Sequence, residues 1–194
     1  MLDKKDFLDI YIAEASKYSM TLDDDFLATL LKKNNINYGD FLLTFPAGQK
    51  DVISLIAEKW NDEVLRLYDG NELRFSEKIT LLLKLKVKIA LENETLFTNL
   101  YSMCLLPKYI DVSYKITHLD VNFILDIAGD KSLDFSYYTK RLSLGAVYTS
   151  TMFVAYRTQN IDKTGHFIDK RIKNIIDFTK AKNGFFNNLK KCFT

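Results

Sequence analysis

The chain has 194 residues, 47% of them hydrophobic and 27% charged, which is the composition of an ordinary soluble globular protein. This length suffices for one domain with a sizeable core or for two small ones. It holds 2 Pro and 7 Gly, against roughly 10 and 14 at average usage, which argues against a many-turned β-protein. Two distant cysteines, Cys104 and Cys192, cannot form a disulfide framework or a four-thiolate metal site.

Charge is unevenly distributed along the chain. The net charge is +2 overall, but it is +8 from residue 131 onward and −6 before it. The C-terminal third therefore either meets an anionic partner or is a solvated face without one. The mixed charge of the first residues predicts no targeting segment, and the longest uncharged run, 142–156, is shorter than the ~20 residues of a membrane-spanning helix.

Apolar residues recur at helical spacing along most of the chain. Residues 83–89 also alternate like a strand, but a lone strand would lack a partner, so the pattern there favours a helix. The predicted helices are 3–19, 21–31, 38–45, 46–68, 81–91, 93–105, 108–128, 134–157 and 167–179. The predicted fold class is all-α, with about nine helices.

The first three predicted helices are short, and the second and third are joined by an Asn-rich turn, which makes them a candidate helix-turn-helix. A longer helical bundle follows. The predicted organisation is a helix-turn-helix-like subdomain (1–45), a helical domain (46–182) and a C-terminal tail (183–194).

Catalytic constellations are absent from the sequence. His118 and His166 lie on different predicted helices, and no glycine-rich phosphate loop or nucleophile motif occurs. The sequence predicts no enzyme, no cofactor and no metal site.

A helix-turn-helix before a helical bundle is the plan of TetR-type transcription regulators. However, the segment 34–49 carries a single charged residue, Asp40, and residues 1–69 have a net charge of −5. Because neutralisation of phosphates supplies most of the non-specific affinity for DNA, this end would repel the duplex. A ligand-responsive regulator is therefore the alternative hypothesis, and no nucleic-acid partner is expected.

One long stretch, 128–141 (AGDKSLDFSYYTKR), closely resembles the signature of the ubiquinone-biosynthesis accessory family of the ninth Coq protein and its α-proteobacterial relatives. Tyr137 departs from the Trp that is usual there. The resemblance extends from residue 38 to 182. Further matching residues are Leu144, Tyr148, Thr151, 167–172 and 45–48.

The resemblance implies a TetR-like fold that does not bind DNA and that forms homodimers through its last helices. It implies binding of isoprenoid lipids or quinone intermediates in an apolar cavity, and presentation of them to the demethoxyubiquinone hydroxylase. It also implies contact with a membrane surface through an amphipathic C-terminal segment. The expected location is the bacterial cytoplasm, peripheral to the inner membrane.

The run 142–156 is apolar nearly all round, so it needs cover on more than one side. It is either an ordinary core helix or one wall of the lipid cavity. The candidate lipid-binding residues are Ile124, Leu125, Ala128, Leu144, Val147, Tyr148, Thr151 and Met152.

The motif after residue 133 also has two interpretations. As structure, Asp134 caps a helix and Phe135, Tyr138 and Leu142 are core. As function, an aromatic ring and two cations without obvious structural need form a hot spot for the hydroxylase. The candidate partner-binding residues are Asp134, Tyr137, Tyr138, Lys140 and Arg141.

An isoleucine stripe on the last predicted helix is the candidate dimer interface, expected to pack on its symmetry mate as a four-helix interface. It consists of Ile168, Ile172, Ile175 and Ile176. The tail 183–194 combines apolar residues with lysines and is either a membrane-interface segment or disordered.

Overall fold

The computed structural model describes residues 2–18, 22–132 and 135–192, with side-chain detail for all of them except 135 and 179–192. The predicted all-α class is confirmed, since these residues form nine α-helices and one short 3₁₀ helix and no strand. The elements are α1 (Lys4–Ala15), α2 (Asp24–Lys33), α3 (Tyr38–Thr44), α4 (Gln49–Leu67), α5 (Phe75–Glu92), α6 (Glu94–Cys104), η1 (Pro107–Tyr109), α7 (Ile110–Ala128), α8 (Phe135–Thr158) and α9 (Ile161–Cys192).

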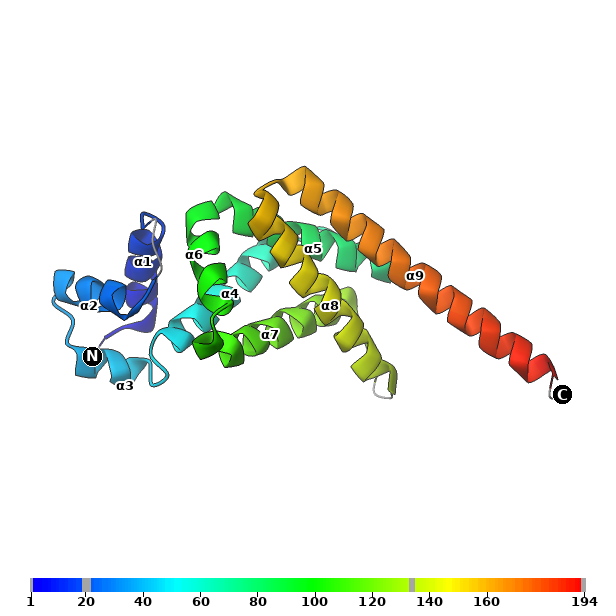
Figure 1. Cartoon of the computed structure of the whole chain (residues 1–194), viewed down its shortest axis with the longest axis horizontal. Coiled ribbons are helices and arrows are strands. Elements are labelled where there is room, and N and C mark those ends of the chain that lie inside the picture. The colour runs from blue at the N-terminus through cyan, green and yellow to red at the C-terminus, as the bar shows by residue number, and fades with distance from the viewer. Residues whose placement is uncertain (1, 19–21, 133–134, 193–194) are drawn as a thin grey trace.

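Helices α1, α2 and α3 gather at one end of the molecule (Figure 1). Each begins at a side-chain cap, since Asp3, Asp23 and Asn37 accept hydrogen bonds from backbone N–H groups of the first turns. Three phenylalanine rings, of Phe7, Phe41 and Phe45, meet in the core of this unit with centroids 5.1–5.3 Å apart. Phe26 of α2 joins them through an edge-on contact with Tyr11 of α1, with ring centroids 5.5 Å apart, so aromatic packing links all three short helices.

The ambiguous segment is the helix α5, so the strand alternative is wrong. The helix also starts earlier than predicted, at Phe75, because Glu77 folds back to accept from the backbone N–H of Arg74 and satisfies the first turn. Leu82, Leu83 and Val87 fall on one face and are almost fully buried. Burial of this face is what decides between helix and strand.

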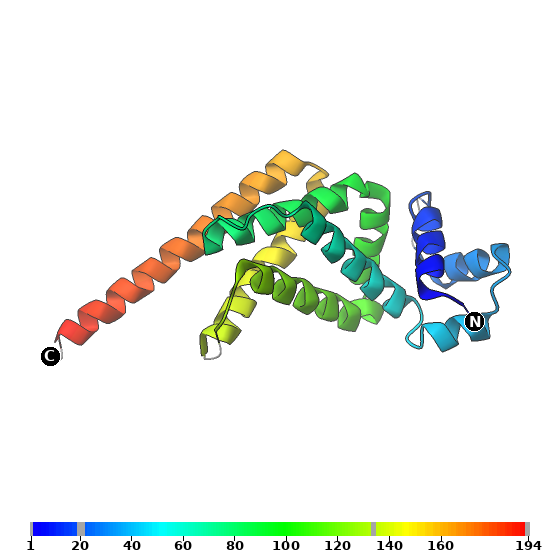
Figure 2. The ribbon, with the colours of Figure 1, turned by 180° about the vertical axis from the view of Figure 1, so that it is seen from behind.

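Helices α4, α5, α7, α8 and α9 build the larger bundle (Figures 1 and 2). Gly129 ends α7 in the left-handed conformation, with φ 89°, and the chain then returns as α8. The second core cluster fills the space between α5, α7, α8 and the first half of α9. Whether residue 45 separates two domains stays a prediction.

Helix α9 is longer than predicted at both ends, and it continues through the residues assigned to a tail, as far as Cys192. Its C-terminal part extends away from the bundle (Figures 1 and 2). The sequence from 161 to 192 contains no Pro, and Gly184 costs only about 1 kcal/mol within a helix. No helix in the described ranges combines the length and apolar character needed to cross a bilayer.

Candidate functional site

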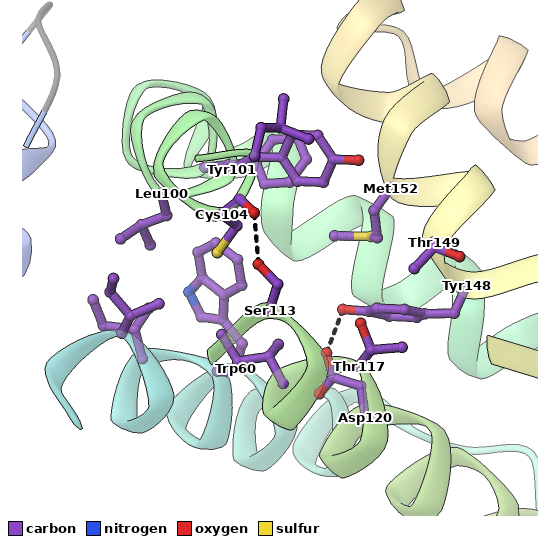
Figure 3. A pocket seen from close by; sticks show the side chains of 16 residues that line it. Trp60, Leu100, Tyr101, Cys104, Ser113, Thr117, Asp120, Tyr148, Thr149 and Met152 are labelled. Atoms are coloured by element: carbon purple, nitrogen blue, oxygen red, sulfur yellow. Dashed lines mark hydrogen bonds between the residues drawn. The ribbon is translucent and has the colours of Figure 1, made fainter. Parts of the chain in front are cut away.

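A half-open pocket of about 200 Å³ lies between α4, α6, α7 and α8 (Figure 3). Its walls are mostly aliphatic and aromatic, with a few hydroxyl groups and one carboxylate on the side of α7 and α8. The lining residues are Ile53, Ile56, Ala57, Trp60, Phe97, Leu100, Tyr101, Cys104, Leu105, Ser113, Ile116, Thr117, Asp120, Tyr148, Thr149 and Met152. An apolar cleft with a few convergent polar groups is the usual form of a small-molecule site.

The apolar wall of the pocket comes from α4 and α6. Trp60 and Phe97 pack with ring centroids 6.5 Å apart, and Phe97 contacts Tyr101 in turn. Burial raises the pKa of the Cys104 thiol, with a contact from Ser113 opposing this effect. The thiol is therefore neutral at pH 7 and behaves as part of the apolar wall.

A buried ion pair borders the opposite side of the pocket. The side chains of Lys86 and Asp120 are 3% and 1% exposed, and Lys86 Nζ lies 2.8 Å from Asp120 Oδ1. Asn61 bridges the pair, since its Nδ2 donates to Asp120 Oδ1 (2.9 Å) and its Oδ1 accepts from Lys86 Nζ (2.8 Å). Tyr148 completes the network by donating its phenolic hydrogen to Asp120 Oδ2.

Within this network Tyr148 stays neutral. Burial raises the pKa of its phenol well above the ordinary value, and the adjacent Asp120 carboxylate raises it further. A phenolate beside a carboxylate would place two negative charges together in a poorly solvated site. The single phenolic proton is therefore held between Tyr148 and Asp120.

Sequence reasoning missed Lys86, Asn61 and Asp120. A signal was present, because Lys86 stands at helical spacing with the apolar Leu82 and Ile89, and Asp120 stands four residues before Ile124. Charged residues within two apolar helix faces indicate a buried pair when the faces meet. Which faces meet was not readable from spacing alone.

Two of the eight candidate lipid-binding residues, Tyr148 and Met152, line the pocket. Thr151 is fully buried, and its hydroxyl has no hydrogen-bond partner. The other five lie in the packed second core cluster, namely Ile124, Leu125, Ala128, Leu144 and Val147. The pocket is thus displaced toward α4 and α6, because the α8 face that carries Leu144 and Val147 packs into that cluster. Lipid binding by these residues stays a prediction.

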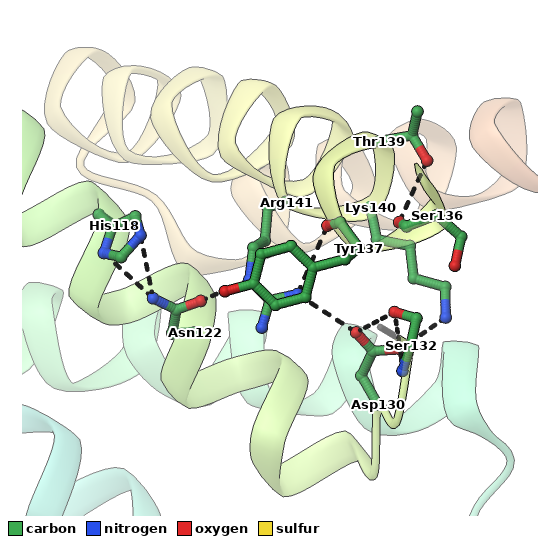
Figure 4. Close-up of polar contacts among 9 residues, drawn as sticks. All are labelled: His118, Asn122, Asp130, Ser132, Ser136, Tyr137, Thr139, Lys140 and Arg141. Atoms are coloured by element: carbon green, nitrogen blue, oxygen red, sulfur yellow. Dashed lines mark hydrogen bonds and ion pairs between the residues drawn. The ribbon is translucent and has the colours of Figure 1, made fainter. Parts of the chain in front are cut away.

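The motif at the start of α8 is organised around Asp130, whose side chain is 2% exposed (Figure 4). Lys140 Nζ lies 2.5 Å from Asp130 Oδ1, and Arg141 Nη1 lies 3.4 Å from Oδ2. Ser132 donates to the same carboxylate. The expectation that the two cations have no structural need is wrong, because both tie the first turns of α8 to the end of α7.

Arg141 also orders its neighbours (Figure 4). Its guanidinium lies 3.4 Å from the ring centroid of Tyr137, and its Nε donates to Asn122 Oδ1 at 2.7 Å. Tyr138 and Leu142 are instead 70% and 78% exposed, so their interpretation as core is wrong. Both side chains belong to the first turns of α8, as does the ordered Tyr137, while Asp134 and the side chain of Phe135 lie outside the described residues. Partner binding at this surface stays a prediction.

We expect the contribution of Asp130 to stability to disappear in acid. Burial opposes its ionisation, but hydrogen bonds from Lys140 and Ser132 outweigh this, and the pKa of Asp130 is lowered. Asp130→Asn should therefore lower the free energy of unfolding by about 1–3 kcal/mol at pH 7. Because the folded pKa lies below the ordinary value of about 4, the difference should shrink as pH falls below 4. Urea unfolding followed by circular dichroism from pH 7 to 3 measures it, and a pH-independent difference would contradict the assignment.

Part of the predicted dimer interface is buried within the protomer itself. Ile168 is fully buried and Ile172 is 9% exposed, both in the second core cluster, while Ile175 and Ile176 are half-buried against it. Contacts with α5 and α8 of the same chain therefore account for the burial of the first two. A dimer through α9 stays a prediction.

Fold and site together define an all-α protein with a half-open apolar pocket that ends at a buried charged network. Among the described residues, no three His, Cys, Asp or Glu side chains gather as potential metal ligands.

Comparison with known proteins gives a match to one family over part of the chain. The sequence model of the COQ9 family matches residues 110–179, which cover α7, α8 and the first half of α9. The predicted resemblance is confirmed, and the chain is related to the COQ9 proteins through this segment.

Three curated relatives illustrate the extent of the similarity. The probable ubiquinone biosynthesis protein coq9, mitochondrial, of Dictyostelium discoideum is 32% identical over 109 residues, 55% of this chain and 36% of the relative. The ubiquinone biosynthesis protein COQ9-A, mitochondrial, of Xenopus laevis is 38% identical over 72 residues, 36% of this chain and 23% of the relative. The human protein COQ9, mitochondrial, is 31% identical over 78 residues, 39% of this chain and 24% of the relative. The matches thus span about a third or less of these relatives.

Proposed function

We propose that this protein is a non-enzymatic accessory protein of ubiquinone biosynthesis, which binds isoprenoid quinone intermediates and presents them to a quinone hydroxylase. The main support for this proposal is the apolar pocket. Two of the four helices that form it, α7 and α8, belong to the segment that matches the COQ9 family. The names of the relatives place those proteins in ubiquinone biosynthesis, and we extend that role to this chain.

Energetics favour presentation of the lipid over storage. A five-carbon isoprene unit gains about 4 kcal/mol on leaving water, at ~0.8 kcal/mol per CH₂-sized group. A bilayer already supplies most of this gain, so transfer into the pocket is close to neutral. A half-open cavity of about 200 Å³ has room for one end of such a lipid, and the rest would lie outside it. We propose that the protein works at a membrane surface, where its lipid starts.

The alternative, a TetR-type regulator, receives little support from the N-terminal unit. Its third helix, α3, exposes Tyr38 (58%) and Leu43 (83%) and carries no cation. A recognition helix needs groups that bind phosphates and base edges. A sequence-specific gel shift at low salt would favour the regulator.

Native mass spectrometry of the purified protein tests the lipid proposal. We expect a co-purifying isoprenoid lipid, and its loss in the pocket-filling variant Ala57→Leu, because Ala57 lines the pocket and is buried. Ala28→Leu, the same change at an exposed position of α2, should keep the lipid. Circular dichroism checks that both variants fold. A protein that is repeatedly empty and shows no affinity for added isoprenoid quinones would overturn the proposal.

A further inference from the structure

The α7 and α8 side of the pocket, around Tyr148, mainly offers hydrogen-bond acceptors, while the indole N–H of Trp60 and the hydroxyl of Tyr101 belong to the α4 and α6 side. Three hydroxyl groups on the α7 and α8 side have their hydrogens committed elsewhere, and Figure 3 draws the bonds of Tyr148 and Ser113. Tyr148 donates to Asp120 Oδ2, Ser113 to the carbonyl oxygen of Cys104 at 2.6 Å, and Thr149 to the carbonyl oxygen of Gly145 at 2.6 Å. A hydroxyl carries one hydrogen and two lone pairs, so each of these groups can offer only an oxygen acceptor to a ligand.

The Lys86–Asp120 ion pair keeps the Tyr148 hydroxyl as a hydrogen-bond acceptor toward the pocket. Asp120 Oδ1 already accepts from Lys86 and Asn61, and Oδ2 accepts from Tyr148. A carboxylate has no hydrogen to return, so Tyr148 cannot reverse its bond and donate into the pocket without leaving Asp120 Oδ2 unpaired. Thr117, close to Tyr148 and Asp120 in Figure 3, can donate or accept and adds no preference.

The size of the pocket limits what can reach this polar side. A cavity of about 150 Å³ holds a benzene ring, so one of about 200 Å³ holds a single substituted ring and little more. The aromatic side chains Trp60, Phe97 and Tyr101 supply an apolar wall suited to such a ring. A long polyisoprenoid chain would extend through the open side.

We infer that the pocket holds the ring end of its lipid and prefers a ring bearing a hydroxyl donor, a phenol or hydroquinone, over the corresponding quinone. This inference rests on the proposed function and deepens it. A ring hydroxyl can donate to the oxygen of Tyr148, whereas a quinone carbonyl would bring an acceptor against an acceptor. Burying two facing acceptors leaves both unpaired, which disfavours the oxidised ring.

Anaerobic titration calorimetry tests the inference with three probes: 2-prenylhydroquinone, the matching 2-prenylbenzoquinone and the ring-free isoprenoid alcohol farnesol. We expect the hydroquinone to bind at least about fivefold more tightly than the quinone, as one net hydrogen bond between neutral groups predicts. Equal or reversed affinities would overturn the inference while leaving the proposed lipid binding intact. Binding of farnesol together with no binding of the hydroquinone or the quinone would also overturn the inference and leave the proposed lipid binding intact. Failure of all three to bind would count against both.

A double variant tests the cause of the preference. In Lys86→Met/Asp120→Asn, the new amide oxygen can keep the hydrogen bond from Asn61, and its nitrogen then donates to Tyr148. The phenolic hydrogen is released and can turn toward the pocket. We expect the preference for the hydroquinone to disappear or reverse, with helical content retained. An unchanged preference in the folded variant would overturn the assignment to Tyr148, and the wild-type comparison decides the inference if the variant does not fold.

Discussion

Asp120→Ala is expected to lower the free energy of unfolding by about 3–5 kcal/mol, because it leaves the Lys86 ammonium buried without its counter-charge. Lys86→Met should cost less, since Asp120 keeps Asn61 and Tyr148 as donors. Urea unfolding followed by circular dichroism measures both. The double variant Lys86→Met/Asp120→Leu should recover most of the loss, because a buried ion pair replaced by apolar side chains is often neutral in stability.

The same helix supplies a matched control for this experiment. Lys84, two residues earlier, pairs with Asp169 at 2.7 Å, but their side chains are 41% and 50% exposed. Lys84→Met should therefore change the free energy of unfolding by no more than about 1 kcal/mol. Equal effects of Lys84→Met and Asp120→Ala would show that the Lys86–Asp120 pair is not buried as described.

The double variant Tyr138→Ala/Leu142→Ala is expected to weaken binding of the partner hydroxylase by about 30-fold or more, if the start of α8 is the docking surface. Large exposed apolar side chains next to an ordered aromatic–Arg pair are typical of binding hot spots, where truncation costs about 2 kcal/mol or more. Stability should stay within about 0.5 kcal/mol, since neither side chain is buried. Surface plasmon resonance with the immobilised hydroxylase measures the affinity.

Leu43→Ala on α3 is the control for exposed apolar area. Leu43 is 83% exposed, close to the 78% of Leu142, but it lies in the N-terminal unit (Figure 1). It should leave the affinity unchanged. If the α8 variant binds as tightly as the wild type, the docking surface lies elsewhere.

The sequence predicted the all-α class and most helices, because helical spacing of apolar residues and side-chain caps are local signals. It misplaced the start of α5, where the deciding contact is between Arg74 and Glu77, and the start of α9. The predicted tail is a helix because nothing between 183 and 192 is strong enough to stop one.

The candidate site was predicted less well, and the reason is geometric. The α8 residues Tyr148 and Met152 line the pocket as expected, but most of its apolar wall comes from α4 and α6, which no sequence pattern connected with the site. Likewise Asp130, which orders Lys140 and Arg141, stands on the far side of a turn from its partners.

The sequence by itself determined the helical class, the family resemblance and the charge asymmetry, because each depends on residue types and their spacing along the chain. Only the tertiary structure decided where the pocket lies, which lysine is buried, and which cations are already paired. These properties depend on which helix faces meet, and the pairs Lys86–Asp120 and Asn61–Asp120 join residues 34 and 59 positions apart. No local pattern specifies such contacts, since they form only when separate apolar faces are buried against one another.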